Sequence, residues 1–211
     1  MGLNCDFLNS ESAKKIKIRG IIHVGCHKFD ELYYYKNNGI EDLLIFEANP
    51  HLYEAVRKIG EENPRVKAFT CAVCDRLGTT KFHITNNEQS SSILKLKDHE
   101  IYYPEVTCQE TVEVECTTID HVIHSNGIDP KAYNVLTMDI QGAELLCLRG
   151  ASEYLNSCDM VFTEVNYAEL YEGCGQIAEL EAELAKYRFV RRYTMDYYIK
   201  NKWGDALYTK E

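Results

Sequence analysis

Acidic and amide side chains follow two apolar stretches of the chain that have the character of buried strands. Asp139, Gln141 and Glu144 come directly after one stretch, and Glu164 lies near the end of the next. The carboxyl ends of neighbouring parallel strands meet at one edge of a sheet, where open α/β sheets bind their ligands. Carboxyl groups gathered there are costly unless they meet a cation, a metal or a hydroxyl. We therefore predict that Asp139, Glu164 and Glu144 are catalytic residues.

Two forms of this chemistry are open. The oxygens of Asp139 and Glu164, with a neighbouring amide oxygen, suit a hard divalent cation such as Mg²⁺, so these carboxylates are candidate metal ligands. Alternatively, Asp139 acts as a general base with help from Glu164, which contributes roughly 10²–10⁴-fold to a rate. His27 and His99 are reserve bases, although a surface or supporting role is the more common one for such histidines.

A glycine turn and a second acid predict a cofactor-binding half of the same edge. Gly25 follows the first apolar run, where the absence of a side chain lets the backbone approach a ligand closely. The larger residues after it break the GxGxxG pattern, which argues against a pyrophosphate-containing cofactor. Glu47 ends the second run, at the place where a carboxylate accepts hydrogen bonds from ribose hydroxyls. Glu31 would bind a cationic amine or support a helix N-terminus, and His23 is equally consistent with a core histidine.

The elements that position these residues alternate between strands and helices, which is the pattern of a parallel sheet covered on both faces. We expect strands at 20–25, 42–48, 66–73, 134–140, 160–166, 187–195 and 205–210. We expect helices at 30–38, 50–58, 143–151 and 177–187. The predicted fold is an α/β fold with a mostly parallel seven-stranded sheet and an antiparallel last strand.

The chain lacks repeats and linkers, so residues 1–211 form one predicted domain with an N-terminal extension at 1–17. Short alternating runs at 79–117 predict a β-rich insertion after the third strand, above the sheet edge that carries function. Polar residues of this insertion would form the rim of the acceptor site, and tyrosines would stack on a sugar; these are Gln89, Ser90, Ser91, Ser92, Tyr102, Tyr103, Tyr167 and Tyr171. Because the last strand ends at the terminus, we expect one module of a longer polypeptide.

Charge and cysteine content limit the partners and the compartment. The formal net charge of −10 repels phosphate backbones, so we expect no nucleic-acid partner. No apolar stretch approaches the ~18 residues of a membrane span. Nine cysteines are scattered through apolar runs, which favours a reduced, cytoplasmic protein. Cys71 and Cys74 form a lone CxxC, which we interpret as two small side chains at a strand end and not as a zinc site.

Several motifs then resemble one family. IIHVGCHKFDE at the first strand, FEANP at the second and AVCDRLG after the third occur in the family's order. They are followed by MDIQGAELLCLRGA, EVN and GDALYTK. Over roughly residues 18–210 the chain resembles the FkbM family of methyltransferases.

The resemblance implies a Rossmann-like class I methyltransferase fold with S-adenosylmethionine as cofactor and S-adenosylhomocysteine as product. The turn at Gly25 would hold the methionine part and Glu47 the ribose, and methyl transfer would occur at Asp139. The full set of expected cofactor-binding residues is His23, Gly25, Cys26, His27, Glu31, Glu47, Ala48, Ala72, Val73, Ser92, Asp139 and Gln141. The chain departs from the family at His23, where an acid is usual, at Cys26, and at Gln141, where many members carry glutamate.

The resemblance implies O-methylation of a hydroxyl, and with the acidic composition it favours a sugar of a glycan or glycosylated metabolite. A non-sugar small molecule such as a polyketide is the alternative. A nicotinamide-dependent oxidoreductase and a non-catalytic cofactor-binding module are remoter interpretations.

Overall fold

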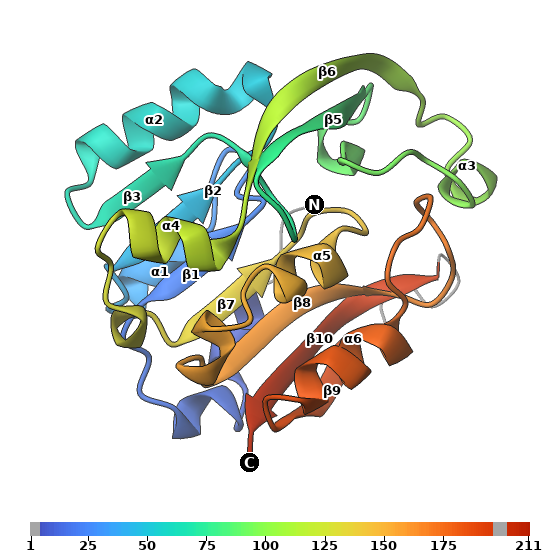
Figure 1. Ribbon diagram of the computed structural model, residues 1–211. Coiled ribbons are helices and arrows are strands. Elements are labelled where there is room, and N and C mark those ends of the chain that lie inside the picture. The colour runs from blue at the N-terminus through green and yellow to red at the C-terminus, as the bar shows by residue number, and fades with distance from the viewer. Residues whose placement is uncertain (1–4, 196–201) are drawn as a thin grey trace.

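A seven-stranded sheet forms the centre of the computed structural model, which describes residues 5–195 and 202–211. Its strands are β1 (Ile21–Val24), β2 (Leu43–Phe46), β3 (Val66–Phe69), β7 (Val135–Met138), β8 (Met160–Asn166), β9 (Phe189–Met195) and β10 (Trp203–Lys210). Their order is β3-β2-β1-β7-β8-β10-β9, and β10 is antiparallel to both of its neighbours. The predicted mostly parallel sheet with an antiparallel last strand is confirmed (Figure 1).

The central strands are buried along their whole length because both faces of the sheet are covered. Every residue of β1, β2 and β7 is buried, and so is every residue of β8. In-register parallel pairing of β1 with β2 and with β7 brings the ends of these three strands to the same edge. Residues that follow the strands are thereby placed side by side.

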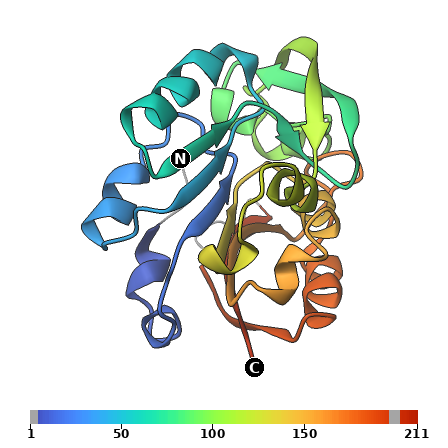
Figure 2. The same cartoon turned by 60° about the vertical axis from the view of Figure 1, so that its left-hand side comes forward.

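Helices cover both faces, as Figure 2 shows from the side. One face packs against α4 (Ile119–Ser125), α5 (Glu144–Arg149) and α6 (Ile177–Ala185). The other packs against α1 (Leu32–Asn37), α2 (Tyr53–Glu62) and two short 3₁₀ helices, η1 (Cys5–Asn9) and η2 (Ala13–Lys15). The fold is Rossmann-like, as predicted.

The N-terminal segment is part of the core. Phe7 is fully buried and stacks on Phe162 of β8, with ring centroids 4.4 Å apart. Leu8 and Ala13 are buried in the same cluster. The predicted extension at 1–17 therefore covers, over its described part, a face of the sheet that would otherwise be exposed to water.

Helix boundaries follow local chemistry. The Thr118 side chain accepts a hydrogen bond from the His121 amide at the start of α4, and Gln176 forms a capping box with Glu179 at the start of α6. Pro50 begins a short 3₁₀ turn, η3 (Pro50–Leu52), that leads into α2. We expected this helix to end by Gly60, but it continues to Glu62, because a helix held by packing tolerates one glycine.

A second sheet of three strands stands above the carboxyl edge of the first (Figure 1). It has the order β4 (Ala72–Val73), β6 (Cys108–Thr117) and β5 (Gly78–Thr85), with β5 and β6 antiparallel. The predicted third strand at 66–73 is wrong in one respect: it breaks after Phe69, and its second part joins the other sheet. The insertion also contains η4 (Glu88–Ser90) and α3 (His99–Tyr102).

A disulfide joins Cys74 to Cys116 in this upper sheet. The expectation that all cysteines are reduced is therefore wrong for this pair. The pairing was hidden in the sequence because 42 residues separate the two cysteines and the β4–β6 pairing brings them together. The CxxC partner Cys71 remains a free thiol.

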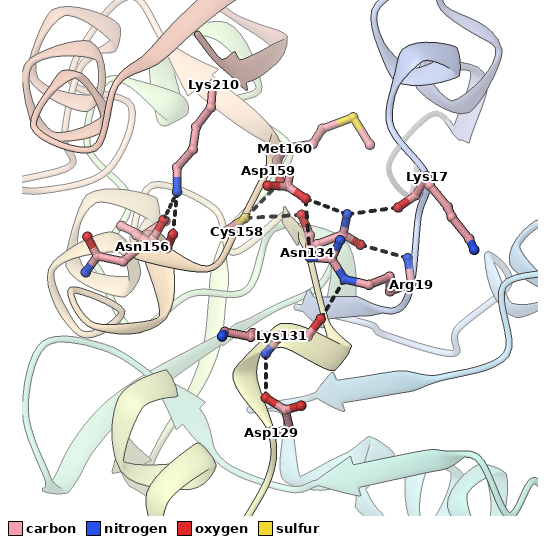
Figure 3. Close-up of polar contacts among 11 residues, drawn as sticks. Lys17, Arg19, Asp129, Lys131, Asn134, Asn156, Cys158, Asp159, Met160 and Lys210 are labelled. Carbon is pink, nitrogen blue, oxygen red and sulfur yellow. Dashed lines mark hydrogen bonds and ion pairs between the residues drawn. The ribbon is translucent and has the colours of Figure 1, made fainter.

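The opposite, amino-terminal edge of the main sheet is held by a polar network (Figure 3). The fully buried Asn134 accepts a hydrogen bond from the Arg19 amide at 2.8 Å and donates to Asp159 at 2.8 Å. It also donates to the Lys17 carbonyl at 3.1 Å. This network ties together the chain segments that enter β1, β7 and β8.

Among the helices of the described residues, none is both long and apolar enough to cross a membrane.

Candidate active site

A cavity of about 250 Å³ opens at the carboxyl ends of β1, β2 and β7. It lies where the strand order reverses between β1 and β7, which is the usual ligand site of such sheets. Most of the predicted cofactor-binding residues line it, namely Gly25, Cys26, His27, Glu31, Glu47, Ala48, Ala72, Val73, Asp139 and Gln141. The sequence therefore located this cavity from residues on separate strands.

Gly25 has a positive φ of +84°. A Cβ atom at this position would lie 2.0 Å from the carbonyl oxygen of Asp139, which no real side chain tolerates. The glycine thus allows the turns after β1 and β7 to touch, in addition to opening the cavity. This contact fixes Asp139 against the floor of the site.

Glu47 connects the turns after β1 and β2. One carboxylate oxygen accepts a hydrogen bond from the His27 amide and the other from the Asn49 amide, each at 2.7 Å. The side chain is buried, and burial raises its pKa while these amides and His27 oppose the rise. Each oxygen retains a further lone pair for a ligand hydroxyl.

One wall of the cavity is apolar. It comprises Phe46, Ala72, Val73, Phe82 and Ile140. Phe46 is held by stacking on Phe69, with ring centroids 5.0 Å apart. A wall of this kind suits a flat aromatic group, with the carboxylate of Glu47 beside it.

Two carboxyl groups, those of Glu31 and Asp139, line another part of the cavity. Burial raises the pKa of Glu31 to about 7, and it raises the pKa of Asp139 as well. Neither carboxyl forms an ion pair with lysine or arginine among the described residues. A buried acid without a cation is costly, so this part of the cavity favours a positively charged ligand.

Gln141 links the acids at the centre of the site. Its side-chain nitrogen donates to Asp139 at 2.6 Å and to Glu164 at 3.0 Å, and its oxygen accepts from the Tyr171 hydroxyl at 2.7 Å. Its backbone is left-handed, with φ +55°, a conformation that is rare outside glycine and typical of functional turns. Ser92 fixes it further by donating to its carbonyl at 2.8 Å.

This arrangement does not support the predicted metal site. The amide nitrogen of Gln141, a donor, lies between Asp139 and Glu164 and satisfies both carboxylates, whereas a cation needs oxygens facing it. Within 5–195 and 202–211, histidine, cysteine, aspartate and glutamate form no group of three that would hold a metal ion. Asp139 and Glu164 lie on either side of Gln141, but the direction of the amide between them was not predicted.

A second cavity, of about 320 Å³, adjoins the first and shares Gln89 and Gln141 with it. Glu164 lines this second cavity and Asp139 the first, so Gln141 stands at the boundary between them. The remaining walls come from the insertion, the segment after β8 and the start of β10. They include His99, Tyr103, Glu105, Tyr171 and Trp203.

Glu164 belongs to a group of neighbouring acids. Asp205 on β10 lies directly opposite it in the antiparallel pair, so the two side chains share one face of the sheet. Burial, then the charges of Asp139, Glu144 and Asp205, raise the pKa of Glu164 well above its ordinary range. Burial and the charge of Asp139 raise the pKa of Asp205 to about 7. Glu164 therefore retains a proton more readily than an ordinary glutamate, beside the second cavity.

Five predicted site residues line neither cavity, and two of them are Tyr102 and Tyr167, which we expected to stack on a sugar. His23 is buried in the core, where its Nδ1 hydrogen-bonds the Tyr35 hydroxyl at 2.9 Å, and burial lowers its pKa to about 4. Ser92 holds the turn at Gln141. Glu144 is fully buried and accepts hydrogen bonds from the amides of Ile140 and Gly142, so it shapes that turn from within.

Sequence reasoning named many of the residues that line the second cavity, but it missed part of its wall. It named Tyr103, Tyr171 and the polar loop, and kept His99 as a reserve base, but it did not include Trp203 or Glu105. Trp203 donates a hydrogen bond to the Tyr103 hydroxyl at 2.9 Å across 100 residues of sequence. The only signal available was its position at the start of a strand that neighbours β8.

Comparison with known proteins identifies relatives. The family model described as the methyltransferase FkbM domain matches residues 23–191. The chain is 28% identical over 161 residues to the 2-O-methyltransferase NoeI of Sinorhizobium fredii, a match that covers 72% of this chain and 65% of that relative. The match thus spans slightly less than two thirds of the relative's length.

Solved structures share the fold. A candidate tRNA (m1A22) methyltransferase of Streptococcus pneumoniae superposes with a TM-score of 0.50 at 10% identity, covering 99% of this chain and 71% of its own. An uncharacterized protein of Listeria monocytogenes also gives 0.50, at 9% identity, covering 100% and 69%. At such identities the likeness concerns the fold alone.

Proposed function

The chain belongs to the FkbM family of methyltransferases, and from this premise we propose that it transfers a methyl group from S-adenosylmethionine to a sugar hydroxyl. The observation that carries the proposal is the pair of adjoining cavities that meet at Gln141. Asp139 lines the cavity suited to a cofactor, and Glu164 lines the one suited to an acceptor.

The residues of the first cavity fit the cofactor. The buried Glu31 and the half-buried Asp139 are acids that match the cationic amine and sulfonium, and the apolar wall at Ala72 and Val73 matches the adenine. Glu47 has lone pairs for the ribose hydroxyls. When bound, the cofactor would supply an electrophilic methyl group on sulfur.

The chain's own contribution to the reaction is orientation and proton removal. Glu164 would accept the hydroxyl proton of the acceptor, because burial and neighbouring acids raise its affinity for a proton. The amide of Gln141 would keep Glu164 and Asp139 in fixed positions on either side of the transfer point. Orientation of this kind supplies several kcal/mol, up to about 7–11 kcal/mol in ideal cases.

A small-molecule sugar is the favoured acceptor. The net charge of −10 opposes binding of a phosphate backbone, and the curated relative is named a 2-O-methyltransferase. A non-sugar hydroxyl compound is the second candidate. Action in the cytoplasm stays a prediction, since the Cys74–Cys116 disulfide weakens the argument from reduced cysteines.

Calorimetry with S-adenosylmethionine, S-adenosylhomocysteine and NAD tests the cofactor. We expect binding of the first two and none of NAD, with methyl transfer to a glycan acceptor panel. Asp139→Asn should weaken binding of S-adenosylmethionine more than binding of S-adenosylhomocysteine, whose sulfur carries no charge. The ratio of dissociation constants should change about 10-fold or more, because one charge partner of the sulfonium is removed.

The exposed variant Glu54→Gln on α2 is the control and should leave both constants unchanged. Absence of heat with both sulfur compounds would contradict the cofactor assignment. An unaltered ratio in Asp139→Asn would contradict the role of Asp139.

A further inference from the structure

We propose that the second cavity is an acceptor site that admits uncharged sugars and amino sugars and rejects anionic sugars such as uronic acids. The inference rests on the proposed function and adds a rule for which acceptors are used. The second cavity has a volume of about 320 Å³, at the lower end of the range for small-molecule sites.

The aromatic side chains of the cavity form a connected wall. His99 lies between Tyr103 and Tyr171, with ring centroids 4.9 Å and 5.4 Å away, and Trp203 is hydrogen-bonded to Tyr103. Aromatic rings offer an apolar face with a polar edge. A pyranose likewise has an apolar C–H face surrounded by hydroxyls, so the two surfaces are complementary.

An unsatisfied polar group adds a second argument for a ligand with hydroxyls. The Nδ1 atom of His99 is buried and has no hydrogen-bond partner in the structure, although such groups are normally satisfied. Burial lowers the pKa of His99, so its ring is neutral and has one donor and one acceptor nitrogen. A ligand hydroxyl would satisfy the unpartnered nitrogen in either tautomer.

The charges around the cavity set the selectivity. Glu105 at the exposed rim and Glu164 inside are acidic, and no lysine or arginine lines the cavity among the residues that the structure describes. A carboxylate or sulfate on the acceptor would therefore meet the negative charge of Glu105 at the rim, and it would lose its water inside the cavity without a compensating cation. An ammonium group would meet acids and aromatic faces, both of which attract cations.

The chain has a single tryptophan, and it lies in this cavity, so its fluorescence reports acceptor binding directly. The probes are methyl glycosides of glucose, galactose, mannose and fucose, the corresponding amino sugars, and methyl glucuronide and galacturonide, titrated into protein saturated with S-adenosylhomocysteine. We expect saturable changes for neutral or amino members, and at least 10-fold weaker binding for each uronide than for its neutral partner.

Glu105→Gln tests the charge rule without changing the proposed base. It should raise uronide affinity several-fold relative to the neutral sugar, whereas Glu54→Gln should change neither. Equal binding of uronide and neutral sugar, or no response of Trp203 to any probe, would overturn the inference.

The two proposals fail separately. If the protein methylates a sugar that does not change Trp203 emission, the proposed activity is supported and the assignment of the second cavity as the acceptor site is contradicted. If Trp203 responds to sugar but the protein binds no S-adenosylmethionine, the second cavity is supported as a sugar site and the proposed methyltransferase activity is contradicted.

Discussion

The two edges of the main sheet use the same kinds of polar residue in opposite ways. At the amino-terminal edge, Asn134 is fully buried and saturated with hydrogen bonds, and Asp159 faces Arg19 (Figure 3). At the carboxyl-terminal edge, Glu164 faces Asp205, and their partners among the described residues are an amide and other acids. One edge satisfies its polar groups, and the other gathers like charges.

The difference shows that unfavourable contacts between buried acids are confined to one edge of the sheet in this comparison. Proteins tolerate departures from local stability mainly at functional sites. The amino-terminal edge contributes to folding, and the carboxyl-terminal edge is completed by ligands that bring cations and hydroxyls. The contrast is clearest in two asparagines that are both fully buried: Asn134 has several partners, and neither side-chain atom of Asn166 has one in the structure.

Removal of the proposed base gives the largest expected effect. Glu164→Gln should lower kcat for methyl transfer by roughly 10²–10⁴-fold, because the acceptor proton loses its destination. Its unfolding free energy should stay nearly equal, since glutamine has the size and polarity of the protonated carboxyl that burial favours at this position. Steady-state kinetics and urea denaturation measure the two. Full activity, or marked destabilisation with activity retained, would contradict the contrast between the edges.

Asp205→Asn should change how stability depends on pH. The native pKa of Asp205 is raised from 3.8 to about 7, so between these values the folded state binds a proton that the unfolded state has lost. The stability that this bound proton contributes is fully present below pH 3.8 and is lost as pH rises through about 7. Between these values the unfolding free energy falls by about 1.4 kcal/mol per pH unit. Denaturation of the ligand-free protein from pH 4.5 to 7.5 should show a flatter decline in the variant. An unchanged slope would show that the carboxyl titrates normally.

The two buried asparagines form a matched pair. Asn134→Ala should lower the unfolding free energy by about 2–3 kcal/mol, because the Arg19 amide and Asp159 lose a buried partner. Asn166→Ala removes the same atoms but no internal hydrogen bond, so it should cost about 2 kcal/mol less. Urea denaturation of both variants gives the difference. Equal losses would mean that packing, and not hydrogen bonding, dominates both sites.

The smallest effect is expected at the surface of the amino-terminal network. Arg19 and Asp159 are each about two-fifths exposed, with 3.3 Å between their charged atoms. Arg19→Met should cost about 0–1 kcal/mol at low salt and less at high salt. Denaturation at two ionic strengths checks this. A loss of unfolding free energy as large as that of Asn134→Ala would show that the ion pair, and not Asn134, contributes most of the stability of the network.

Sequence reasoning brought together residues that follow separate strands and line one cavity. Asp139 and Glu47 were predictable because each follows a continuous apolar run, and parallel pairing brings such ends together. The predicted metal site is not supported, because the direction of the Gln141 amide depends on the left-handed turn and on Tyr171, and neither could be read from the sequence. His23 lies on a strand like a site residue, but its partner Tyr35 comes from a helix on the other side of the cavity wall.

The insertion and the last strand were harder for a different reason. Their side chains acquire a function only through contacts across long stretches of sequence, as between Tyr103 and Trp203 or between the two bonded cysteines. Alternation within the insertion predicted β5 and β6 but gave no register against the main sheet. Local pattern specifies an element, and the three-dimensional arrangement specifies its partners.

The central position of β1 has a consequence for folding. Its neighbour β2 follows β1 closely in the chain, but β7 on the other side of β1 begins only at Val135. Phe7 can stack on Phe162 only after β8 has also been synthesised. During synthesis the first three parallel strands therefore wait with an open, apolar edge that invites pairing with other chains. Such distant pairings also make folding slow. The turn at Gly25 has no side chain that would obstruct the turn after β7. It therefore allows β7 to pair with β1 and to cover this edge once the second half of the sheet has been synthesised.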